Sequence, residues 1–300
     1  MEYRRPPMSP SALEERATQL TERHGQRLQG LTHAGEAQQA LRAGLTAAME
    51  TEEREVGLLD QLLSLFVDKP QTPLVDALTA HHEQAVQQVR ALGHHIEALE
   101  ADRKLLEKDI RALNEELLDL RADTLTAGRV LGQAALKRDA LALRRRADDS
   151  LELQAQSDEL EALHWDRATE HRRFQATGDR LQGLLELNRE LREVFRDQHQ
   201  RLCRLHDAGT GTLTRMRRHL VTLRAAASAR DLTDETERAL TDLRSSVGRV
   251  CVVADESAST LSEHVDELEH RMRRLDRDAD SRRDADAEVE AALKRVRRWQ

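Results

Sequence analysis

Apolar residues recur with heptad spacing between Val75 and Leu141. If Val75 is counted as position a of a repeat abcdefg, every d position through Leu141 is apolar. A helix turns about once every 3.6 residues, so such a stripe stays on one side only if helices wind around each other with a left-handed twist. The pattern predicts a coiled coil in which the interacting residues, called the seam here, are Leu78, Leu92, Ile96, Leu99, Leu106, Ile110, Leu113, Leu117, Leu120 and Leu131.

Prolines divide the first part of the chain. Residues 1–9 are expected to form a disordered tail, and Ser9-Pro10 provides an N-cap and a first-turn proline for a first long helix over 10–67. Its apolar stripe is interrupted by His24, Gln38, Glu52 and Glu55, which predicts a looser packing partner. The following Asp-Lys-Pro-Gln-Thr-Pro stretch is short, and a short connection usually returns the next helix antiparallel.

A long coiled-coil segment is predicted over 73–207. The apolar pattern lapses over 144–150 and resumes shifted by one residue, which favours a bend or a turn there over an unbroken helix. Asn188 falls at an a position and is assigned to the interaction set, because a buried amide at such a position commonly selects the register of a coiled coil.

The stretch Asp207-Ala-Gly-Thr-Gly-Thr212 reads as a second break, followed by a C-terminal helical segment over 212–300 with a basic end. A weaker interruption is expected near 228–233. The predicted fold is all-α, with long coiled-coil helices that form an elongated antiparallel hairpin or helical bundle.

Composition supports a thin helical core. Aromatic residues make up 2% of the 300 residues and charged residues 34%, which is typical of long helices. The net charge of −8 is weak evidence against binding nucleic acid. The start of the chain shows no secretion signal, and the longest apolar run, Val56 to Val67, is too short to cross a bilayer. We therefore expect a cytoplasmic protein, and the composition is most typical of bacteria.

Few residues suggest chemistry. His199, Cys203 and His206 share a helical face at a spacing that a Zn²⁺ ion can use, but we favour the simpler reading that they are ordinary helix residues beside the seam. His82 at an a position could make assembly sensitive to pH. No phosphate-binding loop or nucleophile motif is present. We expect no enzyme activity, no catalytic residues, no bound metal and no cofactor.

The C-terminus combines apolar and basic residues, with Leu293, Lys294, Arg295, Val296, Arg297, Arg298 and Trp299 forming a candidate patch for a membrane or a protein partner. Such a patch can lie on an anionic membrane surface or in the groove of a partner. Alternatively, the cations simply suit the helix dipole.

The predicted function is that of a non-enzymatic coiled-coil scaffold. It would act as a cytoskeletal element or adaptor by forming a homo-oligomer or by binding a partner helix. The alternative is a peripheral membrane-remodelling protein that polymerises on lipid, and a third reading is a coiled coil associated with DNA.

Overall fold

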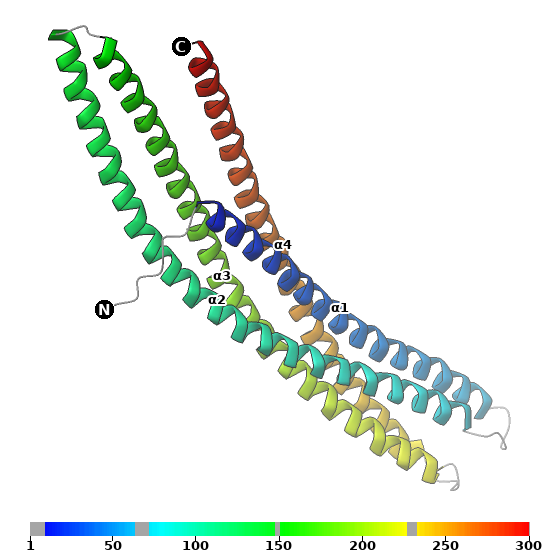
Figure 1. The fold of residues 1–300 in the computed structure, drawn as a ribbon. Helices are drawn as coiled ribbons and strands as arrows, with labels where there is room; N and C mark the ends of the chain where they lie inside the picture. Colours follow the sequence, from blue (N-terminus) through cyan, green and yellow to red (C-terminus); the bar gives the residue numbers. More distant parts are fainter. Residues whose placement is uncertain (1–9, 64–71, 148–150, 227–232, 300) are drawn as a thin grey trace, which may run out of the picture. The chain divides into compact units, whose positions relative to one another are not determined.

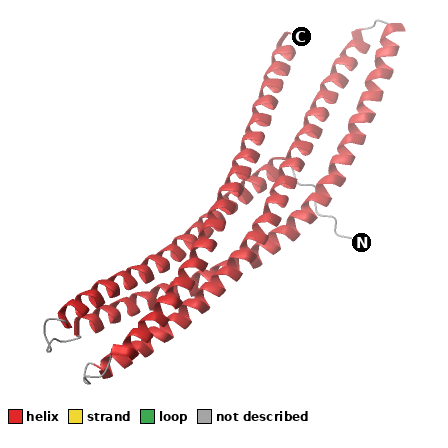
Figure 2. Cartoon of the chain, turned by 180° about the vertical axis from the view of Figure 1, so that it is seen from behind, coloured by secondary structure: helices red, strands yellow, loops and turns green. Residues whose placement is uncertain are grey.

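The computed structural model describes residues 10–63, 72–147, 151–226 and 233–299, and it is helical throughout these ranges (Figures 1 and 2). The helices are α1 (Pro10–Leu63), α2 (Thr72–Ala147), α3 (Leu151–Ala226) and α4 (Thr233–Trp299). They pack against one another, so the prediction of an all-α fold is confirmed.

The helices divide between two compact units. Unit 1 contains Met1–Gln26, Leu106–Leu191 and Leu268–Gln300, and unit 2 contains Arg27–Leu105 and Arg192–Glu267. Each unit therefore includes parts of all four helices and has its own core.

In unit 1, buried apolar side chains come from all four helices, including Leu20 of α1, Leu113 of α2, Leu184 of α3 and Leu268 of α4. Ion pairs border this core. Arg16 Nε lies 3.3 Å from Glu116 Oε1, and Arg23 Nη1 lies 3.2 Å from Asp109 Oδ1, so the residue numbers fall along α2 as they rise along α1.

The α3 and α4 segments of unit 1 are joined in a similar way. Arg180 Nη2 lies 3.2 Å from Asp276 Oδ1, and Arg271 of α4 pairs with Glu190 of α3. Here too the numbers fall along one helix as they rise along the other.

In unit 2, polar contacts accompany the apolar core. Gln88 Nε2 of α2 donates to the Ala40 carbonyl of α1 at 3.0 Å. The hydroxyls of Thr212 on α3 and Ser246 on α4 form a buried hydrogen bond of 2.7 Å. Gln38, one of the polar residues at which looser packing of the first helix was predicted, is fully buried among the core residues of α1. The helix is therefore tightly packed at this position.

The predicted break at 207–212 is wrong, because α3 continues through it. The heptad that buries Leu202 and Leu205 places Gly209 and Thr212 at the next core positions. A Cβ atom at Gly209 would lie 3.0 Å from Val89 Cγ2, so the glycine allows close packing of α3 on α2. Thr212 also donates to the Ala208 carbonyl at 3.0 Å, which satisfies its hydroxyl within the helix.

Other predicted boundaries fall partly outside the described residues. The first helix is described to Leu63, so its predicted end at 67 is not covered. The same holds for the tail over 1–9 and for residues 148–150, which separate the end of α2 from the start of α3.

Candidate functional site

Most predicted seam residues are buried within a single chain. Leu92, Leu99, Leu106, Ile110, Leu113, Leu117 and Leu120 are buried among neighbouring helices. Ile96 and Leu131 are half-buried, and the side chain of Leu78 lies outside the described residues. The buried leucines therefore pack against the chain's own helices, and they are not free to meet a second chain.

Asn188 is fully buried in the core of unit 1, in the part of α3 between Leu187 and Leu191. Within the described part of the chain, neither its Nδ2 nor its Oδ1 has a hydrogen-bond partner. An unpaired buried amide costs free energy. The position is therefore destabilising in itself.

Of the three predicted metal-ligand candidates, Cys203 contacts His199, and His206 contacts Asp207. Cys203 Sγ lies 3.9 Å from His199 Nδ1, and His206 Nδ1 lies 3.7 Å from Asp207 Oδ1. Burial raises the pKa of the Cys203 thiol, and the charges of Asp207 and Glu100 raise it further. A metal needs the thiolate, and among the described residues no three His, Cys, Asp or Glu side chains form a metal-binding group.

Histidines also lie close together in unit 2. Partial burial lowers the pKa of His95, and the nearby His33 of α1 and His94 of α2 lower it further. Protonation of His95 is therefore opposed by its surroundings. His82, the residue predicted to make assembly sensitive to pH, is half-buried on α2.

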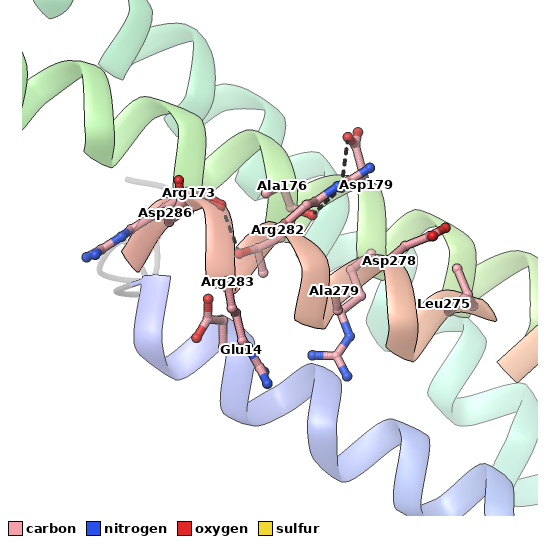
Figure 3. A pocket seen from close by; sticks show the side chains of 12 residues that line it. Glu14, Arg173, Ala176, Asp179, Leu275, Asp278, Ala279, Arg282, Arg283 and Asp286 are labelled. Carbon is pink, nitrogen blue, oxygen red and sulfur yellow. Dashed lines mark hydrogen bonds and ion pairs between the residues drawn. The ribbon is translucent and has the colours of Figure 1, made fainter. Parts of the chain in front are cut away.

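A cleft of about 80 Å³ lies in unit 1 between α1, α3 and α4 (Figure 3). Positive and negative charges are equal in number among its lining residues. The arginines are Arg173, Arg180, Arg282 and Arg283, and the carboxylates are Glu14, Asp179, Asp278 and Asp286. Arg282 Nη1 donates to the Ala176 carbonyl at 3.4 Å and lies 3.4 Å from Asp179 Oδ2. Pockets for small molecules usually measure about 300–1,000 Å³, so this cleft is better explained as a charged contact between helices.

The predicted C-terminal patch lies on α4, which is helical to Trp299. Of its side chains the structure describes only Arg295, which is exposed and donates from Nε to the Ala291 carbonyl at 3.3 Å. Its role as a binding surface remains a prediction.

The sequence analysis missed an apolar surface on α2, formed by Leu118, Leu125, Leu136 and Leu143. These side chains are 64%, 67%, 71% and 64% exposed, and all four belong to unit 1. We call this surface the leucine face. Since Leu117 beside it is only 6% exposed, the leucine face lies on the side of α2 away from the core.

The spacing of these leucines places them on one line. They follow one another after seven, eleven and seven residues. At about 100° per residue, a step of seven falls about 20° short of two turns and a step of eleven passes three turns by about 20°, so the four leucines stay within about 20° of one another around the helix. The face extends about 37 Å along α2. In the predicted heptad Leu118 and Leu125 occupy position b, and Leu136 and Leu143 occupy position f. Leucines at these solvent-facing positions were the signal in the sequence that could have revealed the leucine face.

Comparisons of this chain with family models, with curated proteins and with solved structures found no match. Within the described ranges, no helix has an apolar stretch long enough to cross a bilayer.

Proposed function

We propose that this chain is a non-enzymatic helical scaffold, a cytoskeletal element or adaptor, that acts by associating with further copies of itself. Its helices are proposed to form an antiparallel coiled-coil bundle. The opposite direction of residue numbers in the pairs Arg16–Glu116 and Arg23–Asp109 supports this arrangement. So does the alternation of three- and four-residue steps between buried positions, as in Leu13, Ala17 and Leu20 of α1.

The leucine face is the observation that carries the proposal. Single exposed leucines are common on protein surfaces, but four of them, each about two-thirds exposed, lie on one line of one helix. Contiguous exposed apolar surface marks sites of interaction. Burying each of these side chains would contribute about 1–2 kcal/mol, a share of the full value for a leucine.

The seam favours the same conclusion. Because Leu92, Leu106 and Leu113 are already buried within one chain, association through them would require the bundle to open. The leucine face is available while the bundle stays closed. We therefore place association on the outside of α2.

Light scattering on the full chain over a range of concentrations tests the proposal. The monomer mass is 34.1 kDa, and we expect the measured mass to rise above that value as concentration increases. A mass that stays at the monomer value at every concentration would contradict self-association.

A further inference from the structure

We propose that two copies of this chain pair through their leucine faces, with the two α2 helices antiparallel and a twofold axis passing between Val130 and Leu131. This inference rests on the proposed self-association, and it adds the surface, the direction and the register of the contact.

The spacing of the leucine face is the same in both directions along the chain. Leu118 and Leu143 are equally far from the point between Val130 and Leu131, and so are Leu125 and Leu136. In a twofold interface, residue i of one copy meets residue j of the other, and j meets i. Antiparallel pairing about this point therefore places Leu118 against Leu143 of the second copy, and Leu125 against Leu136, twice each.

The centre of the face accommodates a long side chain. Arg129 is exposed and lies on the same line as the leucines, and the pairing places it against Gly132 of the second copy. A Cβ atom at Gly132 would meet no heavy atom within 4 Å. The glycine thus leaves space in which the Arg129 side chain can lie. A parallel pair would instead place Arg129 against Arg129, and like charges that meet directly repel each other.

The charged edges of the face also fit antiparallel pairing. Exposed Arg121 and Asp139 lie along one edge, and the same edges of the two helices meet when the helices run in opposite directions. Arg121 then lies beside Asp139 of the second copy, offset by about one residue, or about 1.5 Å. Within its own chain Asp139 Oδ1 contacts Arg138 Nη2 at 3.1 Å, and Oδ2 remains to accept from Arg121.

The other edge carries a second complementary pair. Glu115 and Arg144 are exposed along it. The same pairing places Glu115 within about two residues of Arg144 of the second copy, a distance that these long side chains can span. Both pairs occur twice in the dimer, so four ion pairs border eight leucines.

A charge exchange tests the register. The dissociation constant of the dimer is measured by sedimentation for the full chain and for Arg121→Asp, Asp139→Arg and the double variant. Each single substitution creates two repulsive contacts, and we expect it to weaken the dimer by at least about tenfold. The double variant restores opposite charges and should return the dissociation constant to within about threefold of the unmodified chain.

Two further variants test the leucine face itself. Leu136→Glu places a charge in its middle and should leave a monomer, with helicity by circular dichroism unchanged because the side chain is exposed. Leu105→Glu is the matched control, since Leu105 is 50% exposed on another side of α2, and it should leave the dissociation constant unchanged.

The outcomes separate this inference from the proposed function. If the unmodified chain associates and Leu136→Glu associates equally well, this pairing is wrong while self-association stands. If the double variant stays as weak as the single ones, the antiparallel register is wrong. If the unmodified chain remains a monomer throughout, both proposals fail.

Discussion

Substituting Gln38 by leucine should stabilise the protein, although it replaces one buried side chain by another of similar size. Gln38 is fully buried in unit 2, and neither its Nε2 nor its Oε1 has a hydrogen-bond partner within the described part of the chain. Leaving a buried polar group unpaired costs about 1–3 kcal/mol. Leucine removes that cost and packs as the apolar residues at Ala34 and Leu41 do, so we expect Gln38→Leu to raise the free energy of unfolding by about 2 kcal/mol.

The matched substitution Thr212→Val should change the free energy of unfolding in the opposite direction. It also removes polarity from a buried position of unit 2 and keeps the shape of the side chain. Here, however, the Thr212 hydroxyl lies 2.7 Å from that of Ser246, which is itself buried. Valine leaves the Ser246 hydroxyl without this partner, which should lower the free energy of unfolding by about 1–2 kcal/mol.

Urea titrations followed by far-ultraviolet circular dichroism measure both changes. The reasoning requires a higher urea midpoint for Gln38→Leu and a lower one for Thr212→Val. If Gln38→Leu lowered the midpoint, the Gln38 amide would have to contribute favourable interactions, and the assignment of an unpaired buried amide would be refuted.

Three further predictions concern packing, pH and thiol reactivity. Leu106 is fully buried, so Leu106→Ala should lower the free energy of unfolding by about 2–5 kcal/mol in thermal melts. Leu105→Ala, at the exposed neighbouring position, should lower it by less than about 1 kcal/mol. Equal losses would contradict the assigned burial. Burial, together with the charges of His33 and His94, lowers the pKa of His95 in the folded state. The unfolded state therefore binds more protons, and the free energy of unfolding should fall as the pH drops below about 6.5. A His95→Gln variant whose stability has the same pH profile would refute this. Burial raises the pKa of the Cys203 thiol, so iodoacetamide should alkylate it more slowly in the folded chain than in urea, and equal rates would contradict the raised pKa.

The heptad pattern of α2 predicted the buried side of that helix from sequence. Leu92, Leu99, Leu106 and Leu113 occupy d positions and are buried, because the step of seven residues keeps one face of a helix against its neighbours. The pattern could not show that this face is covered within one chain. That depends on which helices meet, and residue spacing on one helix carries no such information.

The break predicted at 207–212 failed because local preference was weighed above register. Glycine and threonine are poor helix formers in isolation, but Gly209 and Thr212 occupy core positions of the heptad through Leu202 and Leu205. Tertiary packing outweighs a cost of about 1 kcal/mol per glycine. The close approach of Gly209 to Val89 shows that this position favours a residue without a side chain.

The leucine face was missed for a related reason. The predicted seam was built from positions a and d, and these four leucines occupy positions b and f, so they were not included in it. The exposed fractions of the four side chains show that they form an apolar line, with Arg129 near its centre, on a helix that is already packed on its other side.

Disulfide trapping across two copies tests the proposed contact most directly. Arg111 and Arg129 are exposed on the same side of α2, five helical turns apart, so they form a matched pair. Each is replaced by cysteine in a chain that also carries Cys203→Ser and Cys251→Ser. In the antiparallel pair, the two copies of position 129 are offset by about 4.5 Å along the helix, whereas those of position 111 are about 58 Å apart. The account predicts an oxidised dimer for Arg129→Cys and a monomer for Arg111→Cys; equal trapping at both positions, or trapping at position 111 alone, would contradict it.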